Sequence, residues 1–325
     1  MVSKSKNSTS SILSHMRPMS QVVDEANSRI VDAIEGRRDS YITRWMRINQ
    51  TIESIQESEL VVIGGRPGSG KSAFANLLVQ DIFNKELNPY KSMGLYFSLE
   101  MPAYQQVVRW YSNAHQIESK SILSSRNPIK KSVYENLKRT GNDLTSMNVL
   151  FHDIPLHPKA IANTVVEAIR RNKGFRIFLI VDHSRLVTGN DQERLRIEEL
   201  VTYCHTLNNK YGVIVILLSQ MNRDIEKERD RTKMGNSLPV MADLFAASAM
   251  EQFATTILLL HRPEMYSVKK FMGEDAKNLL AINVAKQRSG WTGAVLMKSN
   301  FPFYDVHDGN TVLMTENGYV FRFAD

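Results

Sequence analysis

Short apolar runs alternate with helical patterns along most of this chain. Apolar residues recur at the three- and four-residue steps of an amphipathic helix in residues 72–84, 102–115, 158–171 and 191–211. Unbroken apolar runs lie between or beside these helices, at 60–63, 94–98, 175–181 and 213–218. Strands of a parallel sheet that is covered by helices on both faces have this unbroken apolar character. The pattern therefore predicts an α/β fold built on one doubly wound, mostly parallel sheet.

The C-terminal end of the chain has a different pattern. Its apolar runs are divided by Gly, Asn and Asp and lie at 279–285, 293–297 and 319–323. Such punctuation is typical of antiparallel hairpins. We expect these hairpins to extend the same sheet, so that residues 39–325 form one domain.

The N-terminal end is polar and then helical. Residues 1–17 hold six serines, two lysines and one arginine but no acidic residue, a composition that predicts a disordered tail. An amphipathic helix follows within residues 18–38, with Ser20 placed to cap its start and Gly36 to end it. Its apolar stripe consists of Val23, Ala26, Ile30 and Ile34. The pattern alone does not decide whether the stripe packs on its own domain or on another subunit.

Composition and charge argue against a membrane-spanning, secreted or disulfide-bonded protein. The chain has 325 residues, 42% of them hydrophobic, which is enough for a sizeable core. No apolar run approaches the ~18 residues of a membrane span, and no secretion signal follows the N-terminal lysines. The single cysteine, Cys204, excludes an internal disulfide, so we expect a cytoplasmic protein. The net charge of +7 favours a polyanionic partner such as nucleic acid but does not establish one.

The most specific motif follows the first apolar run. It matches G-x-x-x-x-G-K-[ST] at every position and consists of Gly65, Arg66, Pro67, Gly68, Ser69, Gly70, Lys71 and Ser72. A strand precedes it and a helix follows, so backbone N–H groups and the helix dipole can surround a triphosphate. In such a loop Lys71 reaches the β- and γ-phosphates and the Ser72 hydroxyl binds Mg²⁺. We therefore expect ATP and Mg²⁺ as cofactors.

Two carboxylates are candidates for the chemistry of phosphoryl transfer. Asp182 ends the run 175–181 and so lies at the carboxyl edge of the sheet, where it can serve as the Mg²⁺-side acid. Glu100 follows the run 94–98 and can activate the attacking water. Each also has a simpler explanation. Asp182 can cap the next helix, and an acid near the start of a helix, such as Glu100, is favoured by the helix dipole.

Taken together, these motifs resemble those of the DnaB-type replicative helicases, a RecA-like family of hexameric motors that translocate on single-stranded DNA. The resemblance covers roughly residues 20–305 and keeps the family's order of motifs. The matching blocks are residues 65–72, 97–102, Asp182, 218–223, 243–244 with 251–252, and 286–290. The resemblance implies a RecA-like ATPase that acts as a ring or filament on single-stranded DNA.

The resemblance also implies roles for individual residues. It makes Glu100 the catalytic glutamate, Asp182 the Walker B aspartate and Gln220 the sensor of the γ-phosphate. It places Phe245, Ala246 and Ala247 in the loop that touches DNA phosphates, where backbone N–H groups can make the contact. The amphipathic helix takes the position of the family's linker helix, which docks on the adjacent subunit.

Lys286 and Arg288 match the stretch that reaches into the next subunit's nucleotide. Two residues apart on a strand, they project from one face and can stabilise charge on the γ-phosphate, as an arginine finger does in trans. Without the other motifs, two solvated charges at a strand end would be the preferred explanation.

Several positions depart from the family pattern. His183-Ser184-Arg185 replaces Tyr-Leu-Gln, and residues 245–248 replace an Arg-Glu-Ser-Gly run that grips DNA. The family's N-terminal helical domain is expected to be missing, so its primase contacts are not carried over. Residues 222–238 form either a mobile surface loop or a DNA clamp that contains Arg223, Lys227, Arg229, Arg231 and Lys233.

The sequence thus predicts an ATP-dependent DNA helicase, with 5′ to 3′ polarity implied by the family, that acts in the cytoplasm of a bacterium or for a phage or mobile element. An ATP-switched loader or recombination mediator that binds DNA without unwinding it is the main alternative, and a translocase on RNA is a second.

Overall fold

The computed structural model describes residues 16–222, 237–288, 290–309, 312–314 and 320–322. The chain divides into two units, Met1–Ser40 and Tyr41–Asp325. The first contains helix α2 (Met19–Ile34). This helix begins after Pro18, so Ser20 lies inside its first turn and the expected Ser20 cap is wrong. Gly36 follows the helix with a φ of +65°, as expected of a glycine that ends one. The expected tail lies almost wholly outside the described residues.

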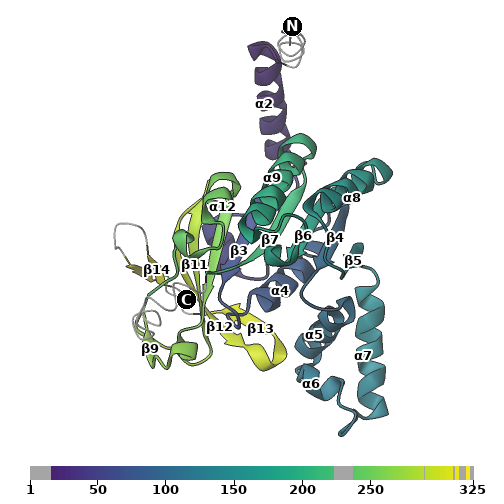
Figure 1. Ribbon diagram of the computed structural model, residues 1–325, viewed down its shortest axis with the longest axis vertical. Helices are drawn as coiled ribbons and strands as arrows, with labels where there is room; N and C mark the ends of the chain where they lie inside the picture. The colour runs from purple at the N-terminus through teal and green to yellow at the C-terminus, as the bar shows by residue number, and fades with distance from the viewer. Residues whose placement is uncertain (1–15, 223–236, 289, 310–311, 315–319, 323–325) are drawn as a thin grey trace. The chain divides into compact units, whose positions relative to one another are not determined.

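One nine-stranded sheet forms the framework of the second unit (Figure 1). Its strands are, in spatial order, β13 (Asp305–Asp308), β12 (Gly293–Asn300), β11 (Leu279–Gln287), β8 (Thr256–His261), β3 (Leu60–Gly65), β7 (Ile214–Gln220), β6 (Arg176–Asp182), β4 (Ser92–Ser98) and β5 (Val149–His152). The strands from β8 to β5 pair in parallel, and β11, β12 and β13 add antiparallel strands beyond β8. The predicted parallel sheet with an antiparallel C-terminal extension is confirmed.

Helices cover both faces of this sheet. One face packs on α4 (Lys71–Phe83) and α5 (Ala103–His115), and the other packs on α8 (Pro158–Arg171), α9 (Glu193–Tyr211) and α12 (Ala247–Phe253). Strand β3 shows why its run is wholly apolar, because Val61 and Ile63 face the first layer while Leu60 and Val62 face the second. The doubly wound arrangement thus follows from the unbroken apolar runs.

Several elements were not predicted from the pattern. Four of them are named above, namely β5, β8, β13 and α12. The others are β1 (Ser40–Tyr41), α3 (Met46–Ile52), β2 (Ile55–Gln56), α6 (Ser119–Ile122), α7 (Lys131–Leu144), β9 (Lys270–Phe271), β10 (Glu274–Asp275) and the 3-10 turns η1 (Ser184–Leu186), η2 (Met241–Asp243), η3 (Pro263–Tyr266) and η4 (Phe301–Phe303). Helix α7 packs beside α5 and buries only Leu137, so its apolar face is too narrow to stand out in the sequence.

The last hairpin corrects one expectation. Strands β14 (Val312–Met314) and β15 (Val320–Arg322) pair with each other in a separate two-stranded sheet. The described part of the predicted run, residues 320–322, therefore does not extend the main sheet. No helix among the described residues is long and apolar enough to span a bilayer.

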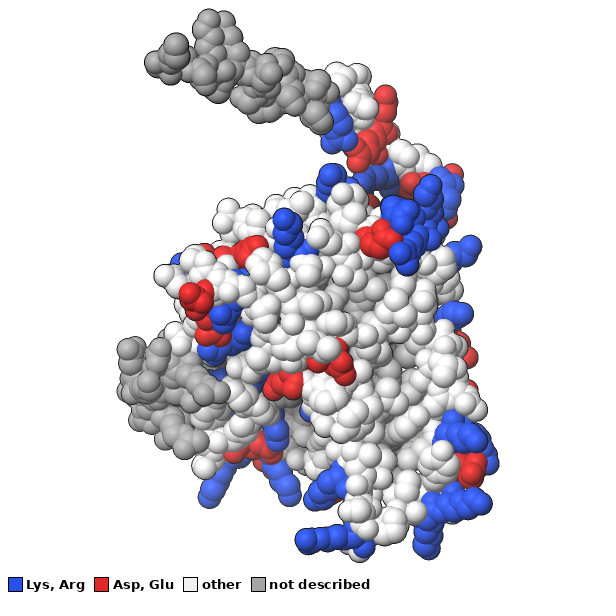
Figure 2. Space-filling model, turned by 45° about the vertical axis from the view of Figure 1, so that its right-hand side comes forward, with Lys and Arg blue, Asp and Glu red and all other residues white. Residues whose placement is uncertain are grey.

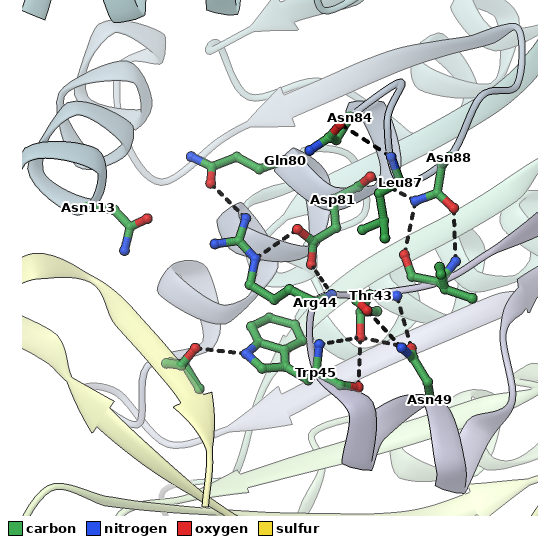
Figure 3. A network of polar contacts seen from close by, with 12 residues as sticks. Thr43, Arg44, Trp45, Asn49, Gln80, Asp81, Asn84, Leu87, Asn88 and Asn113 are labelled. Carbon is green, nitrogen blue, oxygen red and sulfur yellow. Dashed lines mark hydrogen bonds and ion pairs between the residues drawn. The ribbon is translucent and has the colours of Figure 1, made fainter.

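Polar contacts attach the start of the second unit to α4 (Figure 3). Asp81, 3% exposed, accepts hydrogen bonds from the backbone N–H and the Nε of Arg44, both at 2.8 Å. Trp45 stacks on Phe74 of α4 and donates from its indole N–H to the Val306 carbonyl at 2.8 Å. This segment therefore holds together the helix that follows the glycine-rich loop and the last strand of the extension, β13.

Candidate nucleotide site

The glycine-rich loop connects β3 to α4. Gly68 and Gly70 have φ values of +78° and +94°, a backbone region that other residues rarely adopt. A Cβ at Gly70 would overlap the ring of Phe301. These two glycines let the loop fold tightly, so that the N-terminus of α4 faces a cavity of about 290 Å³.

Lys71 is the first residue of α4 and its ammonium group turns back over the loop. Its Nζ donates to the carbonyl of Arg66 at 2.9 Å. Burial lowers the pKa of Lys71 to about 8, although the carboxylates of Asp182 and Glu100 oppose this fall. A buried cation that bonds only to neutral protein oxygens is ready to exchange that partner for phosphate.

Strand order brings the predicted side chains to one edge of the sheet. Strands β3, β7, β6 and β4 are neighbours, so Gln220 and Asp182 end beside the loop and Glu100 follows β4. The backbone N–H of Glu100 donates to the Asp182 carbonyl at 3.2 Å. Glu100, Gln220, Lys71 and Ser72 all line the cavity. The geometry thus places a carboxylate, an amide and a cation around one space, as phosphoryl transfer requires.

Asp182 and Ser72 form the part of the site that fits Mg²⁺. Both carboxylate oxygens of Asp182 are buried without a hydrogen-bond partner of ordinary geometry. Burial raises the pKa of Asp182 to about 6, while the Ser72 hydroxyl opposes the rise. Among the residues that the structure describes, no group of three His, Cys, Asp or Glu side chains is arranged to hold a metal. A magnesium ion here would therefore need oxygens from Ser72, Asp182 and the nucleotide's own phosphates.

Comparison with known proteins relates the chain to one family. The sequence model of the DnaB-like helicase C terminal domain matches residues 42–304. The chain belongs to this family. It is 27% identical over 288 residues to the replicative DNA helicase DnaB of Buchnera aphidicola subsp. Schizaphis graminum, covering 86% of this chain and 58% of that protein. The chain therefore spans little more than half the length of this relative.

Solved structures show the same fold. One solved ATPase domain superposes with a TM-score of 0.75 at 21% identity, covering 88% of this chain and 98% of that one. A DnaB-like replicative helicase, solved in a study of its interactions with primase, superposes with a TM-score of 0.72 at 22% identity and covers 88% of this chain and 66% of that one. The predicted RecA-like ATPase fold of the DnaB family is thus confirmed.

Four side chains at this DnaB-family site were missed in the sequence. Arg262 donates to the carbonyl of Gly68 at 3.0 Å and lies 4.0 Å from the ring centre of Phe301. Arg109 lies 4.9 Å from the ring centre of Tyr304. All four line the cavity beside the loop. No local motif marks them, because they come from α5, from the end of β8 and from the turn after β12.

Lys286 and Arg288 do not line this cavity. Lys286 Nζ donates to the Glu251 carbonyl at 2.5 Å, and Arg288 Nη2 donates to the Gln252 carbonyl at 3.3 Å. Both side chains thus reach the C-terminal turn of α12, in keeping with the expected shared face, although a bulge in β11 lies between Val284 and Lys286. Within a single copy of the DnaB-family domain these cations lie apart from the residues that line the nucleotide cavity.

The expected DNA loop joins Gln220, the expected γ-phosphate sensor, directly. The N–H of Phe245 donates to the carbonyl of Gln220 at 3.2 Å, and the guanidinium of Arg185 lies 4.7 Å from the Phe245 ring centre. The Phe245 N–H is therefore used within the protein and is not available to DNA in this conformation, contrary to expectation. Ala246, with a φ of +56°, and Ala247 begin α12, where backbone N–H groups have no intrahelical partner. The basic residues expected between Arg223 and Lys233 lie outside the described residues.

Proposed function

We propose that this chain is an ATP-dependent DNA helicase motor that uses Mg²⁺ and hydrolyses ATP between subunits of a ring, which we take to be a hexamer. One observation carries the proposal. Lys71, Glu100 and Gln220 surround one cavity, whereas Lys286 and Arg288 lie outside it. A second copy of the chain would bring such cations to the γ-phosphate.

The proposed cycle follows from these residues. The loop and Lys71 bind the phosphates, Asp182 and Ser72 hold the metal, and Glu100 orients and deprotonates the attacking water. Mg²⁺ would supply charge neutralisation on the phosphates when bound. The neighbour's cations stabilise the charge that develops on the transferred group. After hydrolysis the neighbour's cations would lose this charged partner. The interface between subunits would then loosen, and the DNA loops of adjacent subunits would shift relative to one another.

Single-stranded DNA is the proposed track, with movement from 5′ to 3′. On the face shown in Figure 2, Lys and Arg side chains of the main domain gather in separate groups, with uncharged and acidic surface between them. A broad basic face does not account for DNA binding there, so we assign the contact to the N–H groups of Ala246 and Ala247. The named relative is bacterial, which supports the proposal that this chain acts in the bacterial cytoplasm.

A strand-displacement assay on forked DNA with ATP and Mg²⁺ tests the proposal. We expect unwinding, and we expect Glu100→Gln to abolish both unwinding and ATP turnover while it retains ATP binding. A chain that stays monomeric with and without a non-hydrolysable ATP analogue would contradict the proposed ring.

A DNA-binding ATP switch is the second candidate. Phe245 stands where the family has an arginine, and its ring is packed against Arg185, so the loop lacks the expected cation. A loader or mediator would show DNA-stimulated ATP turnover without strand displacement. Comparison of single-stranded DNA with RNA at matched salt identifies the nucleic acid.

A further inference from the structure

His183 lies between two side chains of the nucleotide site. It directly follows Asp182 at the end of β6 and is 5% exposed. Its Nε2 lies 2.9 Å from the side-chain amide nitrogen of Gln220 and 3.6 Å from Oε2 of Glu100. One buried ring thus contacts both the expected γ-phosphate sensor and the expected catalytic glutamate.

The other ring nitrogen determines where the proton resides. The backbone N–H of Arg185 donates to His183 Nδ1 at 3.3 Å. A nitrogen that accepts a hydrogen bond carries no proton, so the proton of the neutral ring is on Nε2. Nε2 is therefore a donor that points toward Gln220 and Glu100.

This assignment fixes the orientation of the Gln220 amide. Two N–H donors cannot bond to each other at 2.9 Å, so the Gln220 amide is turned by 180° and its carbonyl oxygen faces His183. Its NH₂ group is then turned away from the ring. Because Gln220 lines the cavity beside Lys71 and Ser72, that NH₂ group can donate to a phosphate oxygen. The opposite orientation would present a carbonyl oxygen to an anion.

We propose that His183 is a positioning residue that orients the Gln220 amide for the γ-phosphate and holds Glu100 beside it. This inference rests on the proposed function, because it assigns His183 a part in ATP turnover. It also gives a purpose to a residue at which the chain departs from the family's usual tyrosine. His183 acts through its neighbours and does not line the cavity itself.

Two variants of the chain distinguish a positioning role of His183 from a packing role. Glutamine places an amide nitrogen near the position of histidine Nε2, whereas asparagine extends only as far as Nδ1. We expect His183→Gln to keep DNA-stimulated turnover within about threefold of the parent value. We expect His183→Asn to lower kcat roughly 10- to 100-fold, the usual cost of losing an outer-shell hydrogen bond. The Kd for a fluorescent ATP analogue should stay within about threefold in both variants, because the loop and Lys71 are unchanged.

Equal loss of turnover in both variants would show a packing role and overturn the inference, as would parent-like turnover in His183→Asn. If His183→Asn does not unfold cooperatively, His183→Phe takes its place, since it retains a ring without the Nε2–H donor. Absence of DNA-stimulated turnover in the parent chain would instead contradict the proposed function. The two failures are therefore distinguishable.

Discussion

The carbonyl of Gln220 accepts a hydrogen bond from the N–H of Phe245 at 3.2 Å. The side chain of Gln220 lines the nucleotide cavity, so one residue contacts both the ATP site and the proposed DNA loop. An antiparallel bridge between Met221 and Leu244 strengthens this connection. A change at the γ-phosphate can therefore move the start of α12 without any intermediate element.

Gln220→Ala should remove the effect of bound nucleotide on the affinity for DNA. In the parent chain we expect an ATP analogue to change the Kd for single-stranded DNA by about 5- to 150-fold, the usual range of coupling between sites. The variant keeps the backbone hydrogen bond but loses the side chain. The ratio of the Kd values with and without the analogue should therefore approach one. Fluorescence anisotropy with a labelled oligonucleotide at fixed salt measures it. Gln192→Ala, an exposed glutamine before α9, is the control. A ratio in Gln220→Ala equal to that of the parent would contradict the prediction.

Arg288→Ala should lower kcat for ATP on the order of 10³-fold with nucleotide binding retained, as for loss of an arginine finger. Lys71→Ala should be inactive through loss of phosphate binding. Mixed in equal amounts, the two variants should recover about one quarter of parent turnover, because one quarter of interfaces pair an intact loop with an intact Arg288. Arg194→Ala, which removes an exposed pair with Glu198, is the control. A mixture with no more turnover than its parts would rule out the trans role.

Asp182→Asn should stabilise the nucleotide-free protein. Burial raises the pKa of Asp182 to about 6 in the folded chain, so its carboxylate destabilises the fold above that pH. Removing the charge should increase the free energy of unfolding on the order of 2 kcal/mol at pH 7.5. The folded protein takes up this proton before the unfolded chain does, so the advantage should shrink as pH falls through 6 and disappear near pH 4. Urea unfolding of the parent chain and the variant at pH 7.5 and at pH 4 measures this difference in the free energy of unfolding. Mg²⁺-dependent ATP binding should be lost, and a less stable variant at pH 7.5 would refute the argument.

Gly70→Ala should abolish ATP binding. Its φ of +94° costs about 1 kcal/mol or more for alanine, and the new Cβ meets the ring of Phe301. The loop must then open, and its backbone N–H groups no longer point toward the phosphates. Isothermal titration with Mg·ATP measures the loss. Gly36→Ala, where no atom lies within 4 Å of the added Cβ, is the matched control and should bind normally. Normal ATP affinity in Gly70→Ala would show that the loop tolerates the displacement of Phe301.

Asp81→Ala should destabilise the second unit by about 2 kcal/mol without changing ATP affinity. The variant leaves the N–H and Nε of Arg44 without their acceptor in the network of Figure 3. Thermal unfolding and nucleotide titration measure the two effects. Asp32→Ala breaks an exposed pair with Arg37 and should shift stability by less than about 0.5 kcal/mol. Equal effects of the two variants would show that burial of Asp81 does not matter.

The order of elements and the phosphate loop could be predicted because their signals are local. Helical periodicity, unbroken apolar runs and the spacing from Gly65 to Ser72 depend on main-chain geometry over a few residues. Asp182 and Glu100 could be predicted as well, since a residue that ends a parallel strand must lie at the ligand edge of the sheet. The roles of Lys286 and Arg288 came from family resemblance and stay predictions.

Only the tertiary structure decided which distant side chains complete the site. Phe301 packs over Gly70, Arg262 binds the carbonyl of Gly68, and His183 bridges Gln220 and Glu100. These contacts depend on strand order and on the path of the chain between strands. Neither leaves a periodic signal in the sequence, because contact between distant residues follows from how the sheet is assembled. The sequence therefore determined the local chemistry of the site, whereas only the tertiary structure determined how the residues that support this chemistry are arranged.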